Sequence, residues 1–495
     1  MHPKKEQLDD AAKLLLAELE QKELTAKDRN QIPLQEMPSQ DPRERIFNMD
    51  EVALGYTEAQ VRIEALRCLQ CKTKPCIKGC PVEIDIPAFI LEAGKGDYAR
   101  AASIIKESSL LPSVCGRVCP QEVQCQLYCT VGKAKKDVEQ SVSIGRIERF
   151  VADYTREHGL DEVPQVGADT GKSVAVIGSG PASLSAAADL RREGHRVVMF
   201  EALHKVGGVL VYGIPEFRLP KEIVNYEVDI LLKMGVEIRK NYLIGKTRTI
   251  DELFKKDGFD AIFIGSGAGL PKFLNIEGEN SVGVFSANEY LTRSNLMRAY
   301  DTNNALTPIY HSKRVAVFGG GNVAMDAART AKRLGAEVVS IIYRRTEAEM
   351  PARREEIAHA KEEGIEFVFL HAPMRIVPDE KGRVEAVEVI RCELGPEGED
   401  GRRRSIMVEG TEHLRPYDTV IVAIGNDPNP LIKATTKGIE TTRKGTIIVD
   451  PSTGATSLKG VYAGGDIVLG AATVILAMGQ GRTAAKAMNE YLAAL

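Results

Sequence analysis

Residues 174–188 read Val-Ala-Val-Ile-Gly-Ser-Gly-Pro-Ala-Ser-Leu-Ser-Ala-Ala-Ala, an apolar run that turns through two glycines into a run of small residues. The apolar run predicts a buried parallel strand, and the small residues predict a helix packed closely against it. The turn follows the pattern G-x-G-x-x-S, with Gly178, Gly180 and Ser183 at its small positions. Such a turn lets a pyrophosphate approach the backbone at a helix N-terminus, where free N–H groups and the helix dipole favour an anion. We therefore expect a Rossmann-like dinucleotide-binding unit here.

Two further segments extend this site. Residues 195–200 predict a second strand that ends at Glu201, about 20 residues beyond the turn, where a carboxylate can bind the ribose hydroxyls of an adenosine. Residues 460–466 predict a strand that ends in Gly465 and Asp466, which suit the ribityl and phosphate end of a flavin. A helix that begins near Thr473 would point its N-terminal dipole at the flavin ring. These segments indicate FAD.

The same pattern occurs a second time. Residues 314–328 predict another strand, turn and helix, with small residues at Gly319, Gly321 and Ala324. The next strand, residues 337–343, ends in Arg344 and Arg345 rather than in an acid. A carboxylate would repel a 2′-phosphate whereas guanidinium groups pair with it, so this site is expected to prefer NADP over NAD. The alternative is two arginines on a solvated strand end.

Gly207 and Gly208 are further candidates for binding the flavin cofactor, and the residues after them contain no cysteine pair. A thiol reductase would need a dithiol beside its flavin. Electrons are therefore expected to leave the flavin by another route, for which the N-terminal region is the visible candidate.

That region holds eight of the nine cysteines, in two tight runs: Cys68, Cys71, Cys76 and Cys80, then Cys115, Cys119, Cys125 and Cys129. A proline follows Cys80, as in iron–sulfur ferredoxin runs. Zinc is the main alternative, but zinc ribbons usually pair two C-x2-C knuckles and only Cys68 and Cys71 form one. The ninth cysteine, Cys392, is predicted to be an inert core thiol.

Composition sets the remaining bounds. The 495 residues are 43% hydrophobic and 27% charged, which is typical of a globular protein with two to four domains. The net charge is −4 with both signs mixed, so no basic face indicates nucleic acid. The N-terminus lacks the apolar core of a signal peptide, and no run approaches the roughly 20 apolar residues of a membrane span. We expect a cytoplasmic protein.

These features predict an α/β chain with a helical N-terminal iron–sulfur domain and two Rossmann-like, doubly wound dinucleotide-binding domains. The expected divisions are an N-terminal arm and double cluster domain (1–170), a first FAD-binding part (171–300), an NADPH-binding domain (301–415) and a second FAD-binding part (416–495).

From about residue 45 onward the chain resembles a known family. This is the flavoprotein subunit family of the NADPH glutamate synthase small chain, the large subunit of NADH-dependent reduced ferredoxin:NADP oxidoreductase and the N-terminal half of dihydropyrimidine dehydrogenase. The resemblance rests on residues 68–81, 116–120, 144–149, 207–208, 213–220, 343–345, 463–466 and 479–482.

The resemblance implies two 4Fe-4S clusters whose ligands cross between the two cysteine runs. One cluster would be held by Cys68, Cys71, Cys76 and Cys129. The other would be held by Cys80, Cys119, Cys125 and Glu148, because the family completes this cluster with a glutamate or glutamine. Cys115 would then be left without a metal.

The resemblance also implies a function. We expect an oxidoreductase subunit that moves electrons between NADP(H), FAD and two clusters, most similar to the large subunit of the ferredoxin:NADP oxidoreductase, a transhydrogenase that splits electrons at its flavin. A glutamate synthase small chain is a close alternative, and a zinc-binding scaffold without redox chemistry is a more distant one. A second redox subunit, with ferredoxin as a possible partner, would carry the final chemistry, because no acid–base pair for substrate chemistry stands near these motifs.

Overall fold

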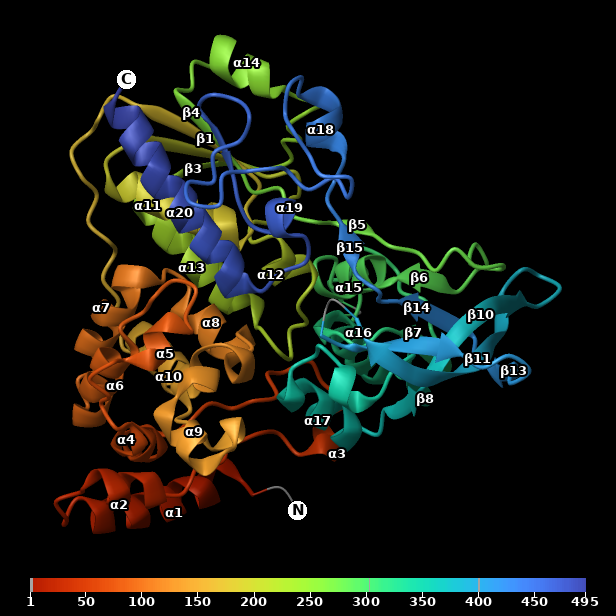
Figure 1. Ribbon diagram of the computed structural model, residues 1–495, viewed down its shortest axis with the longest axis horizontal. Coiled ribbons are helices and arrows are strands. Elements are labelled where there is room, and N and C mark those ends of the chain that lie inside the picture. Colours follow the sequence, from red (N-terminus) through yellow and green to blue (C-terminus); the bar gives the residue numbers. More distant parts are fainter. Residues whose placement is uncertain (1–2, 302, 399–400) are drawn as a thin grey trace.

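A computed structural model describes residues 3–301, 303–398 and 401–495. Its N-terminal third consists of short helices, followed by two parallel sheets and a projecting antiparallel sheet (Figure 1). This arrangement confirms the predicted fold class. None of the helices in the described part of the chain is long and apolar enough to cross a membrane.

The N-terminal helices are short because polar caps and glycines interrupt them. Thr57, Asp85 and Asp97 each accept a hydrogen bond from the third backbone N–H of the helix that they begin. The helices are α1 (Lys5–Leu19), α2 (Ala26–Gln31), α3 (Pro42–Arg45), α4 (Glu58–Arg67), α5 (Pro75–Lys78), α6 (Ile86–Lys95), α7 (Tyr98–Ser108), α8 (Pro112–Val118), α9 (Thr130–Lys135) and α10 (Ile144–Glu157), with 3-10 turns η1 (Gln121–Val123), η2 (Cys125–Tyr128) and η3 (Val138–Gln140).

The first parallel sheet has the order β16-β4-β1-β2-β3. Its strands are β1 (Ser173–Ile177), β2 (Arg196–Phe200), β3 (Glu237–Arg239), β4 (Ala261–Ile264) and β16 (Val461–Ala463). Helix α11 (Pro181–Arg192) packs against α20 (Val474–Ala493), with the carbonyl of Ala182 lying against Gly481. Segments almost 300 residues apart in the sequence therefore build one dinucleotide-binding unit. Helices α12 (Val209–Tyr212), α13 (Lys221–Lys233), α14 (Ile250–Lys255), α18 (Leu431–Thr435) and α19 (Asp466–Leu469) complete this half.

The second parallel sheet has the order β6-β14-β7-β8-β9. Its strands are β6 (Val284–Ser286), β7 (Arg314–Phe318), β8 (Val338–Tyr343), β9 (Glu366–Phe369) and β14 (Thr419–Val422), and its helices are α15 (Ala287–Asn295), α16 (Asn322–Arg333) and α17 (Arg354–Glu362), with a short 3-10 turn, η4 (Glu347–Glu349). Strands β6 and β14 lie outside the 301–415 range. We propose that this domain runs from about residue 284 to about residue 425.

An antiparallel sheet projects from the second domain, at the right of Figure 1. It comprises β10 (His371–Pro378), β11 (Val384–Glu397), β12 (Arg403–Met407) and β13 (His413–Pro416). Cys392 lies on β11, is 1% exposed and packs against Ala372 and Ile390, as a core thiol does. A two-stranded ribbon of β5 (Leu270–Pro271) and β15 (Asn426–Asp427) lies where the chain passes between the two parallel sheets.

Candidate functional site

The first glycine turn forms an open cradle at the end of β1. Gly178 has φ +90°, and a Cβ there would lie 2.5 Å from the carbonyl oxygen of Gly265, so this turn needs glycine. Gly180 begins α11, and no heavy atom would lie within 4 Å of a Cβ added to it. Gly208 has φ +56°, and a Cβ there would lie 3.0 Å from Cα of Gly180. The free space above the helix N-terminus fits the pyrophosphate of FAD.

Glu201 is fixed at the end of β2. Its buried carboxylate accepts hydrogen bonds from the Ser179 hydroxyl and from the backbone N–H of Leu203, the latter at 2.7 Å. Gly207 in turn donates its N–H to the Ser179 hydroxyl at 3.0 Å. Ser183 is buried on α11, where its small side chain lies against the carbonyl of Gly265. Six of the residues predicted to bind FAD therefore meet at one edge of the first sheet: Gly178, Gly180, Ser183, Glu201, Gly207 and Gly208.

Asp466 reaches the same edge from the C-terminal segment. It follows Gly465, where a Cβ would lie 2.9 Å from the Cβ of Ala182 near the start of α11. Burial raises the pKa of Asp466 to about 6, and the N–H of Ala472 donates to its carboxylate at 3.2 Å. Thr473 caps α20 directly after Ala472, so the N-terminus of α20 lies beside Asp466. These placements agree with the predicted ribityl and ring contacts, which stay predictions.

The second glycine turn repeats this geometry on the second sheet. Gly321 begins α16, and the nearest atom to an added Cβ would be Cγ of Pro351 at 3.9 Å. Ala324 is fully buried in the first turn of α16. At the end of β8 the two arginines differ: Arg344 is exposed, whereas Arg345 is 8% exposed and its carbonyl accepts the N–H of Leu370. Arg344 is therefore the side chain that is free to reach solvent from this strand end.

Four cysteines from both runs line one cavity in the N-terminal domain: Cys68, Cys71, Cys76 and Cys129. Cys68 ends α4 and Cys129 begins α9, so the chain crosses between the runs here. In the loop between Cys68 and Cys76, Gln70 and Lys74 have φ of +48° and +43°, a left-handed conformation that non-glycine residues rarely adopt. The Gln70 amide donates to the Cys68 sulfur at 3.5 Å. This grouping agrees with the ligand set that the family resemblance implies.

The second set lies deeper. Cys80, Cys119 and Cys125 are buried. Cys80 and Cys125 lie close enough to Glu148 to interact with it electrostatically, and Cys119 lies close to both of these thiols. Burial raises the pKa of Glu148 to about 8, and its Oε1 has no hydrogen-bond partner. A buried carboxylate oxygen without a partner costs free energy unless a proton or metal satisfies it. This donor set fits an iron–sulfur cluster completed by an oxygen ligand.

Cys115 is the fifth thiol in this area. It lies beside Cys119, and its sulfur is 3.6 Å from the sulfur of Met478 on α20. In the described residues no three His, Cys, Asp or Glu side chains converge to hold a single metal ion. Cys115 therefore lies between the second cysteine set and α20.

Comparison with known proteins agrees with this geometry. Residues 172–489 match the family model described as pyridine nucleotide-disulphide oxidoreductase. Residues 45–160 match the model for dihydropyrimidine dehydrogenase domain II, 4Fe-4S cluster.

The chain belongs to the pyridine nucleotide-disulphide oxidoreductase family. It is a flavin and iron–sulfur oxidoreductase with an NADP(H)-dependent reductase half.

Within this family it is 36% identical to the glutamate synthase [NADPH] small chain of Escherichia coli K12, over 92% of this chain and 96% of that protein. It is 40% identical to the NADP(+)-dependent formate dehydrogenase subunit beta of Moorella thermoacetica, over 85% of this chain, but spans only 60% of that subunit. The fold of Mycobacterium tuberculosis FprA in complex with NADPH matches with a TM-score of 0.55 at 20% identity, covering 65% of this chain and 85% of FprA.

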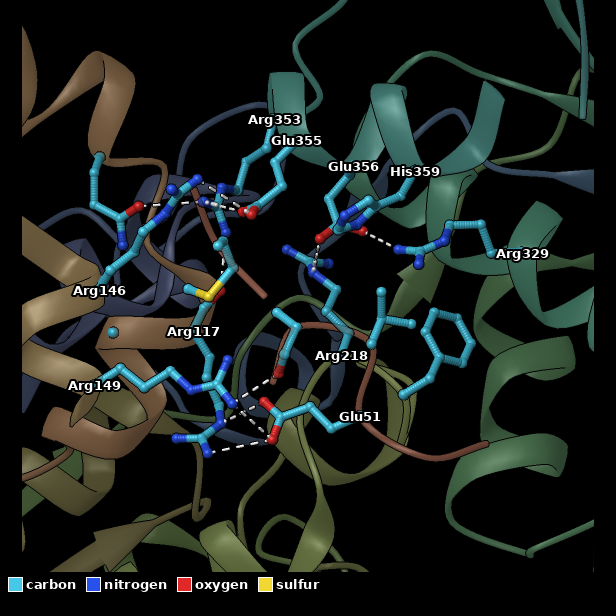
Figure 2. A pocket seen from close by; sticks show the side chains of 16 residues that line it. Glu51, Arg117, Arg146, Arg149, Arg218, Arg329, Arg353, Glu355, Glu356 and His359 are labelled. Atoms are coloured by element: carbon cyan, nitrogen blue, oxygen red, sulfur yellow. Dashed lines mark hydrogen bonds and ion pairs between the residues drawn. The ribbon is translucent and has the colours of Figure 1, made fainter. Parts of the chain in front are cut away.

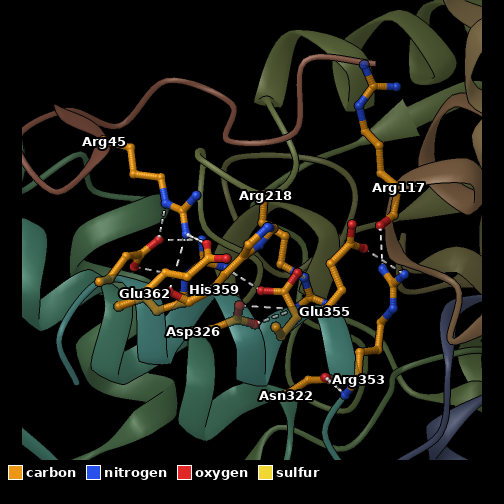
Figure 3. Close-up of polar contacts among 12 residues, drawn as sticks. Arg45, Arg117, Arg218, Asn322, Asp326, Arg353, Glu355, His359 and Glu362 are labelled. Carbon is orange, nitrogen blue, oxygen red and sulfur yellow. Dashed lines mark hydrogen bonds and ion pairs between the residues drawn. The ribbon is translucent and has the colours of Figure 1, made fainter. Parts of the chain in front are cut away.

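Sequence reasoning missed a buried charged junction where the three domains of this oxidoreductase meet. Figure 2 shows its arginines and carboxylates around a pocket. Arg117 and Arg149 share Glu51 and Asp153, while Arg218 pairs with Asp326 on α16 at 2.8 Å. Figure 3 shows the same junction from α16 and α17, with Arg45 bound to Glu362. The ion pairs of Arg45 and Arg218 join the domains at this junction.

Proposed function

We propose that this chain is the NADP(H)-side subunit of a multisubunit redox complex, similar to the large subunit of a ferredoxin:NADP oxidoreductase. The observation that supports the proposal is that α20, which begins beside the proposed flavin site, contacts the region of the second cysteine set, whose Cys125 lies near Cys76 of the first set. Helix α20 contacts this region three times. Gln124 donates to the Thr473 hydroxyl at 3.3 Å, Cys115 touches Met478, and the Pro81 carbonyl lies against Gly479.

The residues hold and orient the cofactors. When bound, NADPH supplies a hydride, FAD converts between two-electron and one-electron transfer, and iron–sulfur clusters carry single electrons. Gly180 and the N-terminus of α11 would bind the FAD pyrophosphate, and Glu201 its ribose. Gly321 and the N-terminus of α16 would bind the pyrophosphate of NADPH, with Arg344 at its 2′-phosphate.

We propose two 4Fe-4S clusters with the crossed ligand sets described above. The first would use Cys68, Cys71, Cys76 and Cys129. The second would use Cys80, Cys119, Cys125 and Glu148, with Cys115 as a neighbour that binds no iron. The unpartnered Oε1 of Glu148 supports the carboxylate ligand.

The first set lies nearer the surface, which supports contact with a partner. Cys68, Cys71 and Cys76 are partly exposed, whereas the other cysteines are buried. Exposed lysines surround this side of the domain: Lys72, Lys74, Lys78, Lys133 and Lys136. We propose that an acidic redox subunit or electron-carrier protein, such as ferredoxin, exchanges electrons here.

A glutamate synthase small chain is the second candidate, favoured by the match over 96% of the Escherichia coli small chain. Anaerobic purification of the native complex tests both. We expect visible absorbance from flavin and clusters, about eight iron atoms per chain, and one companion redox protein. A large amidotransferase companion would favour the second candidate. A colourless, zinc-containing protein would refute both.

A further inference from the structure

Arg353 stands at the point where the NADPH-binding and iron–sulfur domains meet. It precedes α17, and only 7% of its surface is exposed. Its guanidinium group donates to the carbonyl of Arg117 at 2.9 Å (Figure 3). It also donates to Oε1 of Gln121 at 3.1 Å, and both partners belong to the iron–sulfur domain. A planar guanidinium with two such contacts transmits position better than a single flexible charge does.

The backbone of this segment is bound to the second glycine turn. The N–H of Arg353 donates to Oδ1 of Asn322, the first residue of α16, at 2.9 Å. The N–H of Ala352 donates to the carbonyl of Gly320 at 3.2 Å. The backbone N–H groups of two consecutive residues, Ala352 and Arg353, are therefore hydrogen-bonded to the turn that would hold the NADPH pyrophosphate.

The other end of the contact lies beside the second cysteine set. Gln121 is buried, and its N–H donates to the carbonyl of Cys119 at 2.9 Å. The side chain of Gln121 packs on Gly145 of α10, leaving no room for a Cβ there, and Glu148 follows three residues later. The backbone of Gln121 thus contacts Cys119, and its side chain contacts the helix that carries Glu148. Cys119 and Glu148 are proposed ligands of the same cluster.

We propose that Arg353 is a positioning residue that couples occupancy of the NADPH site to the redox state of the second cluster. This inference rests on the proposed function, because it needs both cofactors. A shift of the phosphate-binding turn moves the backbone of residues 352–353, and the guanidinium transmits that shift through Gln121 to Cys119 and Glu148. By linkage, reduction of the cluster must change nucleotide affinity by the same factor by which the nucleotide changes the reduction equilibrium.

The holoprotein tests this with 1,4,5,6-tetrahydro-NADP, which fills the site but cannot exchange a hydride. We expect its Kd to change at least about threefold when the second cluster is reduced, within the range that single contacts modulate coupling. EPR-monitored titration should show the matching shift of that cluster's midpoint potential, at about 59 mV per tenfold change. In Arg353→Ala and in Gln121→Leu both effects should disappear, while iron content and binding to the oxidised protein stay close to wild type.

Arg354→Ala is the matched control. The side chain of Arg354 pairs across the same domain boundary with Glu139 at 3.1 Å on the exposed surface, whereas its contact with Glu122, next to Gln121, is made by the backbone N–H that the variant keeps. It should retain the full coupling. Wild-type coupling in both Arg353→Ala and Gln121→Leu, equal loss in Arg354→Ala, or a wild-type Kd that is unaffected by reduction would overturn the inference. A wild-type protein that lacks the second cluster or does not bind the analogue would instead overturn the proposed function.

Discussion

Gly180 and Gly321 occupy matching positions in the two glycine turns, and the space next to each is open. A valine at either position meets no protein atom closer than 3.9 Å at its Cβ. Gly180→Val should therefore fold but lose FAD, because the branched side chain occupies the place of the pyrophosphate. Gly321→Val should stay yellow and lose reduction by NADPH. Flavin absorbance after gel filtration and stopped-flow reduction of the flavin measure the two effects.

The contrast between these variants is the control. If Gly180→Val keeps its flavin, or if Gly321→Val loses it, the two sites have been assigned in the wrong order. Gly178 could not serve in this test, because a side chain there would collide with the backbone of Gly265 and disturb the fold itself.

Glu148 and Cys115 test the ligand set of the second cluster. Cys115→Ser should keep about eight iron atoms per chain, because the serine replaces a thiol that binds no metal. Glu148→Ala should alter one of two EPR signals and leave the other unchanged. Loss of about four iron atoms in Cys115→Ser would show that the thiol, and not the carboxylate, is the fourth ligand.

Arg344 tests the choice of nucleotide. A charge-assisted pair with a phosphate contributes about 1.5–3 kcal/mol, and exposure reduces this to about 1–2 kcal/mol. Arg344→Ala should therefore lower kcat/KM for NADPH roughly five- to thirtyfold and leave that for NADH nearly unchanged. Arg345 is a poorer choice for this test, because its buried side chain is part of the structure. If the ratio of kcat/KM for NADPH to that for NADH is unchanged, Arg344 does not bind the 2′-phosphate.

At the scale of helices and strands, local sequence patterns predicted the strand–turn–helix units. They did not predict the contacts between segments that lie far apart in the sequence. Both glycine turns were predictable, because strand, turn and helix follow one another within 15 residues. Strand β14 pairs with β6, more than 130 residues earlier, and nothing local in either strand indicates that they border the second sheet. The antiparallel sheet of β10–β13 was not predicted either. The charged junction was missed for the same reason: Arg45, Arg218 and Arg353 find their partners in other domains.

Arg45 shows what one such contact contributes. It ends α3, is fully buried, and binds Glu362 at 2.7 Å and Glu363 at 2.8 Å. Removing one partner of a buried pair costs several kcal/mol, here about 2–4 because Glu363 keeps Arg329 and Arg333. Arg45→Ala should lower the first thermal unfolding midpoint by at least about 4 °C. Arg43→Ala, which removes an 82% exposed arginine two residues earlier, should change it by less than about 1 °C. Equal midpoints for both variants would contradict this role.

At the scale of the whole molecule, the arrangement of the three domains suits electron transfer from the proposed FAD site, through the two cysteine sets, to the surface. The proposed FAD site lies at the edge of the first sheet, α20 joins it to the buried second cysteine set, and the first set lies nearer the surface. The chain folds back from its C-terminus to place α20 there, so the first and last thirds of the sequence meet at the proposed clusters (Figure 1).

The lysines around the shallower set test whether this surface receives the partner. Tyr128 lies against Gly79 beside Lys78, and Lys133 stands 5.4 Å from the Tyr128 ring, so the charges gather around an exposed aromatic contact. Lys74 is partly neutralised by Asp85, which leaves Lys72 and Lys78 as the better targets. Lys72→Glu/Lys78→Glu should slow NADPH-dependent reduction of a negatively charged ferredoxin at least about tenfold at low salt, because electrostatic steering accelerates association ten- to a thousandfold.

Three measurements distinguish weaker docking of ferredoxin from a loss of cofactors in the variant. Reduction of ferricyanide, a small acceptor that needs no docking surface, should be lowered much less than that of ferredoxin. The gap between variant and wild type should close as ionic strength rises, since salt screens exposed charges beyond about 10 Å at 0.1 M. Lys437→Glu/Lys459→Glu, an equal charge change on exposed lysines of the flavin half, should leave ferredoxin reduction close to wild type. If this control slows the reaction equally, net charge and not the cysteine-side surface governs the encounter, and the partner must dock elsewhere.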